Sequence, residues 1–226
     1  DADGVENSVC FPFKDVCPGR WYTRPVMKLR EEGVIDGTSD MFGPHDPALR
    51  VELVTATVRA IELGNTPGPV DTAPFDDVNV DDWFAPFVAY AKQIGLIQSC
   101  AQEESLFCPG DTVSRAAAAE VIALGLLADS VEAFADGQQP AWLFSDVQNP
   151  DDAPYVYALQ DAYAAHGYPD GSFGVDKDIT RAEMAKLICI AKFGPMECAA
   201  FGDPEAPQVF SVTPQIAVSN QSTEFT

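Results

Sequence analysis

A short pattern that returns three times along the chain constrains its fold more than any other feature. Phe-x-Asp-Val occurs at residues 13–16, 75–78 and 144–147, so successive copies begin 62 and 69 residues apart. A repeat of this kind is one supersecondary unit that buries its apolar face by packing against its neighbours. We therefore expect the 226 residues to form a single compact unit assembled from repeats.

Each copy is followed by the pattern of an amphipathic helix. A proline stands near the expected helix start in each copy, where its fixed φ suits the first turn: Pro25, Pro86 and Pro154. Gly33 and Gly95 close this helix in the first two copies, as a left-handed C-terminal cap favours. The third copy has Tyr163 at the aligned position, so we expect its first helix to end differently.

A second helix is predicted from the most constant spacing in the chain. A phenylalanine in a turn is followed eight residues later by an arginine in every copy: Phe42 and Arg50, Phe107 and Arg115, Phe173 and Arg181. We expect each arginine to begin a helix. Thr180 and Glu183 form a capping-box pattern in the third copy. In the second copy Ser114 is the N-cap and Ala117 replaces the glutamate, and the first copy has Leu49 at the cap position.

These patterns divide the chain into five parts. They are a lead-in at 1–10, a first repeat at 11–64, a second at 65–128, a linker with the third repeat at 129–198, and a tail at 199–226. The connections at 65–74 and 129–141 are rich in proline, glycine and acidic residues, which is typical of loops at unit boundaries. The tail alternates apolar and polar residues between prolines, which predicts a stalk or the start of a β domain.

Charge and hydropathy exclude several functional classes. Thirteen basic residues against 35 acidic ones leave a net charge of −22, so broad electrostatic capture of nucleic acid or of an anionic bilayer is excluded, and any anion must bind in a local pocket. The longest apolar stretches, such as 121–128, are far shorter than the roughly 20 residues of a membrane-spanning helix. His45 and His166 lie in no metal or catalytic motif.

The six cysteines fall into three close couples, which are Cys10 and Cys17, Cys100 and Cys108, and Cys189 and Cys198. Their even number and local clustering favour disulfides, and hence an oxidising, extracytoplasmic compartment. The spacing leaves the connectivity open, and six reduced, buried thiols are the alternative.

Together these motifs resemble the S-layer homology domain, a cell-surface anchoring module that usually occurs in threes. The resemblance rests on Phe-x-Asp-Val, the tryptophans that follow it, Gly-Tyr-Pro-Asp-Gly-Ser-Phe at 167–173 and Ile-Thr-Arg-Ala-Glu at 179–183. It covers about residues 11–195. The resemblance implies a mainly α fold, with three such repeats in a pseudo-threefold, three-lobed bundle around a central three-helix core. The short extended C-terminal tail lies beyond the part of the chain that the resemblance covers.

The resemblance also implies grooves between repeats that hold a cell-wall glycan, often one bearing a ketal-linked pyruvate. A carboxylate is well recognised by a bidentate guanidinium together with backbone amides at a helix start. The ligand candidates are therefore the three helix-start arginines and two cap residues: Arg50, Arg115, Arg181, Ser114 and Thr180. The alternative for each arginine is a salt bridge to a neighbouring acid.

Four further residues are candidates for contacts with the sugar. Trp21 and Trp83 can present a ring face to it, although packing beneath the first helix is the alternative. Asp170 and Gly171 lie in the third turn, where an aspartate commonly bonds its own backbone. Because the first two copies lack parts of the capping motif, we expect one or two working grooves rather than three.

The leading interpretation is a non-catalytic, extracellular anchor that tethers an S-layer or another surface protein to wall polysaccharide and that can also self-associate in a lattice. No cofactor is expected, apart from a weak calcium candidate at Asp1 and Asp3. A non-binding spacer or protein-interaction module is one alternative. A wall hydrolase with a carboxylate pair is another, but no acid pair is singled out by the sequence.

Overall fold

The structure of the chain is a computed structural model that describes residues 10, 13–36, 39–100 and 105–198. Its helices are α1 (Thr23–Glu31), α2 (Arg50–Ile61), α3 (Ala85–Gln93), α4 (Arg115–Leu126), α5 (Ala128–Ala135), α6 (Ala153–Asp161), α7 (Arg181–Phe193) and α8 (Pro195–Cys198). Within these ranges there are isolated backbone bridges but no strands. The prediction of a mainly α fold is confirmed.

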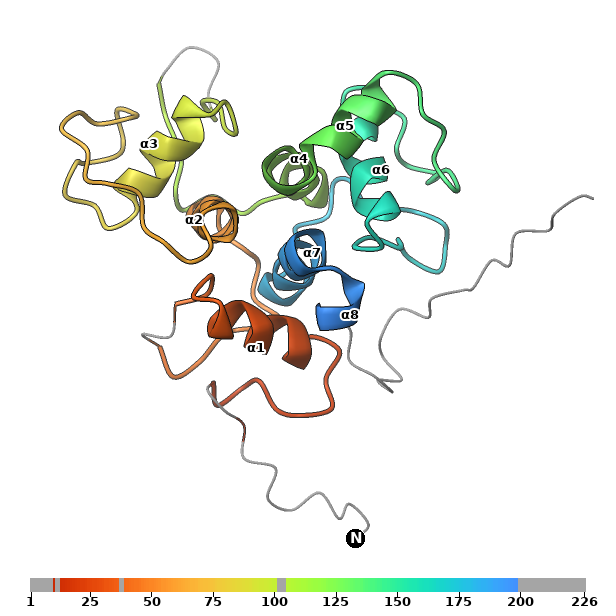
Figure 1. Cartoon of the computed structure of the whole chain (residues 1–226), viewed down its shortest axis with the longest axis horizontal. Coiled ribbons are helices and arrows are strands. Elements are labelled where there is room, and N and C mark those ends of the chain that lie inside the picture. The colour runs from red at the N-terminus through yellow and green to blue at the C-terminus, as the bar shows by residue number, and fades with distance from the viewer. Residues whose placement is uncertain (1–9, 11–12, 37–38, 101–104, 199–226) are drawn as a thin grey trace, which may run out of the picture.

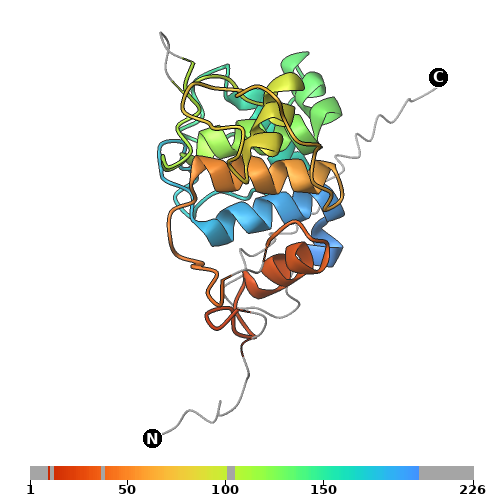
Figure 2. The same cartoon turned by 90° about the vertical axis from the view of Figure 1, so that its left-hand side faces the viewer.

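Three helices lie at the centre of the molecule (Figure 1). Helices α2, α4 and α7 contact one another, and Figure 2 shows α2 and α7 running side by side. Shorter helices pack around them, with α1 against α7, α3 against α2, and α6 against α4. The first helix of each repeat therefore packs on the second helix of the preceding repeat, and the first repeat closes onto the third.

The central helices begin where the sequence predicts, at Arg50, Arg115 and Arg181. Helix α2 is buried on all sides over residues 53–58, as expected for a helix that other helices enclose. On α4, Gly125 lies where an added Cβ would be 3.0 Å from the Cγ2 of Thr57 in α2. A glycine at this position lets α2 and α4 approach closely.

The linker at 129–141 contains a helix that the sequence analysis did not predict, because the acidic residues and Gly137 were interpreted as a loop. Helix α5 forms since Val131 and Phe134, three residues apart, are both buried, and the ring centroid of Phe134 lies 6.1 Å from that of Tyr157 in α6. Asp129 in its first turn interacts favourably with the helix dipole. The expectation of a loop was therefore wrong for residues 129–135.

The first helices of all three repeats end in the same way. Gly33 and Gly95 have φ values of 72° and 75°, as predicted. Tyr163 has a φ of 60°, and the amide of Ala164 donates to the carbonyl of Leu159 at 2.8 Å, as in the other two repeats. The expectation of a different ending was wrong, because the hydrogen bonds of the closing turn hold the tyrosine in the left-handed region.

The cysteine couples form three disulfides, which join Cys10 to Cys17, Cys100 to Cys108 and Cys189 to Cys198. No free cysteine remains in the described part of the chain. None of the helices in these ranges has the length and apolar character of a bilayer-spanning segment. The calcium candidates Asp1 and Asp3 and the predicted stalk at 199–226 lie outside the described residues.

Candidate functional site

The starts of the three central helices meet in a closed ring of backbone hydrogen bonds. The amide of Ala48 donates to the carbonyl of Ile179 at 2.8 Å, that of Ile179 to Val113 at 2.9 Å, and that of Val113 to Ala48 at 3.2 Å. All three residues are buried. Each stands two residues before a helix-start arginine, so the ring fixes the three arginines relative to one another.

The first amides of these helices already have partners inside the protein. The first amide of each helix donates to a loop carbonyl of the next repeat at 2.8–2.9 Å, in the pairs Arg50 and Asp111, Arg115 and Lys177, and Arg181 and Asp46. The second amide of each helix donates to the same loop. The backbone donors that the sequence analysis assigned to an anion therefore serve to join the repeats.

The aspartates of Phe-x-Asp-Val organise the turns that carry the phenylalanines. Asp15 accepts the amides of two turn residues, Phe42 at 2.8 Å and Gly43 at 2.6 Å, and Asp77 does the same in the second repeat. Asp146 accepts three amides, from residues 173–175, at 2.6–3.0 Å. Burial opposes the ionisation of Asp146, but these donors outweigh it and lower the pKa of the carboxyl.

Each helix-start arginine lies over the turn phenylalanine of the next repeat. The distance from the guanidinium carbon to the ring centroid is 5.5 Å for Arg50 over Phe107, 4.8 Å for Arg115 over Phe173, and 4.9 Å for Arg181 over Phe42. The arginines thus lie at the boundaries between repeats, where the resemblance predicts the ligand to bind.

Two of the arginines are neutralised by glutamates. The Nη1 of Arg115 lies 3.2 Å from the Oε1 of Glu183, and Arg181 forms an ion pair with Glu52. Both glutamates are the third residue of the neighbouring central helix. Arg115 is also only 7% exposed. The salt-bridge alternative therefore describes these two arginines, and their role as ligand residues stays a prediction.

Arg50 differs from the other two because Ala117 occupies the position of the glutamate in α4. Within the described residues Arg50 forms no ion pair, its Nη2 donates to the carbonyl of Gln98 at 2.8 Å, and its buried Nε has no hydrogen-bond partner. Burial lowers the pKa of the guanidinium, and the charges of Glu120 and Asp111 oppose that change. Arg50 thus retains a charge that no carboxylate of the described chain neutralises directly.

The two cap residues act as the sequence predicts. The Oγ of Ser114 accepts the amide of Ala117 at 3.2 Å, and the Oγ1 of Thr180 accepts that of Glu183 at 3.2 Å. Glu183 in turn accepts the amide of Thr180 at 2.9 Å, which completes the capping box. A further role for either hydroxyl in binding a ligand stays a prediction.

The predicted tryptophans differ in accessibility. Trp21 is partly buried, packs edge-on against Tyr22 and has the Nζ of Lys186 5.8 Å from its ring centroid. Trp83 is 61% exposed and makes one edge contact with Phe84, so its ring is available to a sugar.

Asp170 and Gly171, the two ligand candidates in the third turn, each have a structural role within that turn. Asp170 accepts both the hydroxyl and the amide of Ser172, at 2.6 and 3.0 Å, and these bonds lower the pKa of its carboxyl. Gly171 has a φ of 82°, which a glycine adopts without strain. The backbone role of Asp170 is thus present, and a contact of either residue with a sugar stays a prediction.

Lys186 is a candidate that the sequence analysis missed, because the residues around it in α7 were interpreted only as a core-facing pattern. Burial, followed by the charge of Arg115, lowers its pKa to about 8, although Glu183 opposes the change. Burial and the charge of Lys186 also lower the pKa of His166. The ammonium has no hydrogen-bond partner within the described ranges. A single lysine inside an otherwise apolar helical run was the available signal.

Comparison with known proteins gives a partial match to the family that these repeats resemble. Two segments of the chain, 12–53 and 143–185, match the S-layer homology domain. The chain is therefore a cell-surface protein, and the match supports an anchoring module that is not itself catalytic. The second predicted repeat, at 65–128, lies outside both matched segments, so three tandem S-layer homology repeats stay a prediction.

Two relatives match part of the chain, and one of them is an S-layer protein by name. The chain is 31% identical over 121 residues to the exoglucanase XynX of Acetivibrio thermocellus, a match over 52% of this chain and 11% of that protein. It is 28% identical over 105 residues to an S-layer protein of Bacillus thuringiensis subsp. finitimus, over 46% of this chain and 13% of the relative. The matches thus cover a small part of each relative, and the enzyme name belongs to a protein that is matched over about a tenth of its length.

Proposed function

We propose that this chain holds a surface protein on the cell by non-covalent binding of an acidic wall glycan, such as a pyruvylated secondary cell-wall polymer, and that Arg50 binds the carboxylate. The S-layer homology segments support a cell-surface anchor. We choose Arg50 because, unlike Arg115 and Arg181, it has no carboxylate partner among the described residues.

The surroundings and the charge of Arg50 suit a ligand carboxylate. The guanidinium lies over Phe107 and Arg50 as a whole is half-buried, so a ligand carboxylate can approach its exposed part, while the Nε is buried away from solvent. A guanidinium binds a carboxylate through two parallel hydrogen bonds, which adds geometric specificity. Because the whole chain has a charge of −22, an anionic ligand requires a local cation such as Arg50, which has no direct ion pair within the described residues.

Two other groups are available to the same polymer. Trp83 exposes a ring that can stack on a sugar, and Lys186 adds a second cation beside Trp21. Simultaneous contacts with one polymer raise the overall avidity even when each contact is weak.

Calorimetric titration of the chain with pyruvylated and depyruvylated wall polymer tests the proposal. We expect the wild type to prefer the pyruvylated polymer. The substitution Arg50→Gln is expected to weaken binding by roughly ten- to a hundredfold, as the loss of a charged hydrogen bond costs about 1.5–3 kcal/mol.

The substitution Ala117→Glu tests the same site without removing the arginine. It supplies the carboxylate that the other two boundaries contain, so we expect it to weaken binding as Arg50→Gln does. Ala117→Gln is the matched control, since it has the same shape without the charge and should retain most of the affinity. Full binding by both Arg50→Gln and Ala117→Glu would show that Arg50 is not the carboxylate site, and a wild type that ignores the polymer would favour the spacer alternative.

A further inference from the structure

Outside its own helix, Arg50 is held by one segment of the second repeat, at 98–111. The amide of Arg50 donates to the carbonyl of Asp111 at 2.9 Å, and its Nη2 donates to that of Gln98 at 2.8 Å. Its guanidinium carbon lies 5.5 Å from the ring centroid of Phe107. Because no ion pair fixes Arg50 within the described residues, the position of its side chain depends on this segment.

A disulfide between Cys100 and Cys108 closes the segment. Cys108 directly follows Phe107, and Cys100 comes two residues after Gln98, so the disulfide links the two groups that the guanidinium contacts. The corresponding turns of the first and third repeats contain no cysteine. There, a glutamate pairs with the arginine instead. The second repeat thus has a covalent bond where the other two have an ion pair.

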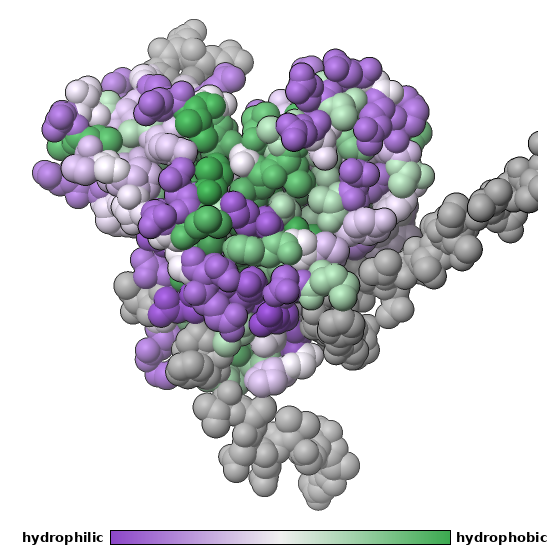
Figure 3. Space-filling view, viewed as in Figure 1, coloured by the Kyte–Doolittle hydropathy of each residue, from purple (hydrophilic) through white to green (hydrophobic). Residues whose placement is uncertain are grey.

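The three disulfides differ in accessibility. Cys189 and Cys198 are 0% and 1% exposed, Cys10 and Cys17 are half-buried, and Cys100 is exposed. Figure 3 shows hydrophilic side chains over much of the lobe that contains α3, so a polar reagent can approach it. Thiol–disulfide exchange requires a thiolate to reach a sulfur atom, and an accessible disulfide therefore exchanges first.

We infer that the Cys100–Cys108 disulfide is a redox-sensitive link that positions Arg50, and that a small neutral thiol reduces it before the other two disulfides. The regulatory role rests on the proposed function of Arg50, whereas the order of reduction does not. The thiol is a neutral one, because a chain with a charge of −22 repels anionic thiols.

The reduction takes place in two exchange steps. The thiolate of one small thiol attacks the Sγ of Cys100, the protein disulfide breaks, and Cys108 leaves as a thiolate that takes up a proton. A second thiolate then attacks the small-thiol sulfur of this mixed disulfide, so that Cys100 leaves as a thiolate and is protonated in turn. Two thiols are oxidised to one small-molecule disulfide, and the protein disulfide is reduced.

Reduction affects the two contacts of the guanidinium unequally. Phe107 stays in place, because its amide and that of Cys108 donate to Asp77 at 2.7 and 2.8 Å. Gln98 lies on the other side of the disulfide, so reduction removes its covalent link to this fixed turn. Arg50 is then less well preorganised, and its affinity for a carboxylate falls.

Limited reduction of the whole folded chain with 2-mercaptoethanol tests the order of reduction. Alkylation with iodoacetamide and peptide mass spectrometry identify the thiols that form. We expect Cys100 and Cys108 to be labelled at thiol concentrations that leave the other four cysteines unlabelled.

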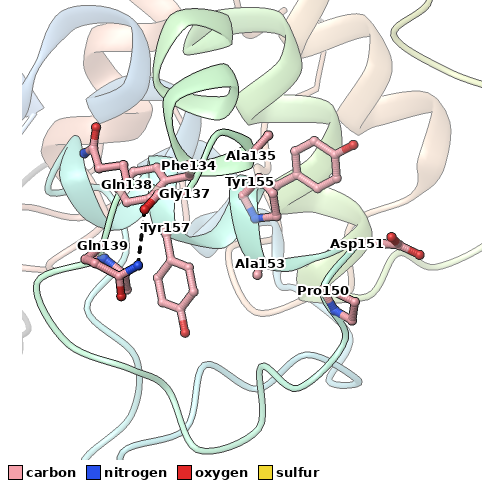
Figure 4. Close-up of a pocket in the computed structure, with 12 residues that line it drawn as sticks. Phe134, Ala135, Gly137, Gln138, Gln139, Pro150, Asp151, Ala153, Tyr155 and Tyr157 are labelled. Atoms are coloured by element: carbon pink, nitrogen blue, oxygen red, sulfur yellow. Dashed lines mark hydrogen bonds between the residues drawn. The ribbon is translucent and has the colours of Figure 1, made fainter.

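NMR of the same samples tests whether the disulfide positions Arg50, and it needs no polymer. The Nε–Hε signal of Arg50 should shift on reduction. The pocket of about 650 Å³ between α5 and α6 provides an internal control, because neither Arg50 nor any residue of 98–111 lines it (Figure 4). The amides of Ala135 and Gly137, which do line it, should not shift.

Calorimetric titration with the pyruvylated polymer tests the effect on binding. The double substitution Cys100→Ser and Cys108→Ser removes the disulfide without a thiol. It should weaken binding by roughly three- to tenfold, as expected for the cost of ordering one side chain. The matched control is Cys10→Ser with Cys17→Ser, which removes a disulfide outside the segment at 98–111 and should bind as the wild type does.

The inference is overturned if another disulfide is reduced first, or if the Arg50 signal does not move or moves together with the pocket amides. It is also overturned if the Cys100→Ser, Cys108→Ser variant binds the polymer as tightly as the wild type while Arg50→Gln does not. A wild type that ignores the polymer contradicts the proposed function, and the labelling order and the Arg50 signal still decide whether the disulfide is the accessible one that positions Arg50.

Discussion

At the scale of single residues, one alanine distinguishes the three repeat boundaries. Glu52 and Glu183 each close a cap and also neutralise an arginine of another repeat, whereas Ala117 does neither. In the sequence, Ala117 looks like a defect in the repeat pattern. In the structure, it is the change that leaves Arg50 without a glutamate partner. A missing residue in a repeat is informative about function once its structural partner is known.

The substitution Ala117→Gln is expected to increase the free energy of unfolding by roughly 0.5–1 kcal/mol, because it completes a capping box with Ser114. Ala117→Glu should add a further few tenths of a kcal/mol through Arg50. Urea denaturation of the two variants and the wild type measures both increments. A loss of stability in either variant would show that the second boundary cannot adopt the arrangement seen at the other two.

Lys186 should make stability depend on pH in the alkaline range. Its folded pKa of about 8 lies below the usual 10.5, so the unfolded chain binds more protons between these values and the stability of the wild type rises with pH across that window. Lys186→Met removes this contribution. We expect the variant to be more stable than the wild type by roughly 1–3 kcal/mol below pH 8, with the difference disappearing towards pH 10.5. Denaturation curves at pH 7, 9 and 10.5 measure it, and a constant difference would contradict the assignment.

At the scale of elements, the first helix of each repeat ends in a turn of the same conformation but of different sequence. The turn after each first helix has a left-handed residue, and Gly33 and Gly95 adopt it without strain while Tyr163 does not. A left-handed conformation costs an L residue with a side chain roughly 1–2 kcal/mol. The third repeat retains the turn because the following residues, Ala164 and Ala165, are buried.

Tyr163→Gly should therefore stabilise the protein, by about 1 kcal/mol, since the side chain is largely exposed and little burial is lost. The reverse change, Gly95→Ala, should destabilise by a similar amount, because its added Cβ meets no atom within 4 Å and only the backbone conformation is penalised. Thermal unfolding of both variants measures the two effects, and a destabilised Tyr163→Gly would indicate that the ring makes a contact that matters.

The aspartates of Phe-x-Asp-Val accept different numbers of turn amides, so their substitutions should reduce stability by different amounts. Asp146→Asn should lower the free energy of unfolding by roughly 1–3 kcal/mol at pH 7, because three amides lose a charged acceptor. Asp15→Asn should cost less, since Asp15 accepts two amides. The pKa of Asp146 is lowered by folding, so its contribution is present above pH 4 and is lost as the pH falls through the folded pKa. Unfolding measured from pH 7 to pH 3 should therefore show the Asp146→Asn difference shrinking.

At the scale of the whole molecule, the repeats close on themselves. Helix α1 of the first repeat packs on α7 of the third, and the ring of Ala48, Val113 and Ile179 takes one residue from each repeat. No repeat forms its contacts from its own residues alone. This closed arrangement predicts that the repeats do not unfold one after another.

Calorimetric unfolding should therefore show one transition for the described part of the chain, with equal calorimetric and van't Hoff enthalpies. Ile179→Ala should shift that single transition to lower temperature, by roughly 2–5 kcal/mol in stability, without splitting it. Two separate transitions in either protein would contradict the prediction that the three repeats unfold together.

The helices that begin at Arg50, Arg115 and Arg181 could be predicted, because spacing and caps depend on residues close together in the chain. The three close cysteine couples favoured disulfides for the same reason, although the sequence left their connectivity open. The glutamate partners of the arginines could not be predicted, since each lies in another repeat and the pairing depends on which central helix packs beside which. The same holds for the burial of Lys186 and for the packing of α5 against α6. Local chemistry follows from neighbours in sequence, whereas the charge state and accessibility of a site depend on neighbours that only the packing of the repeats provides.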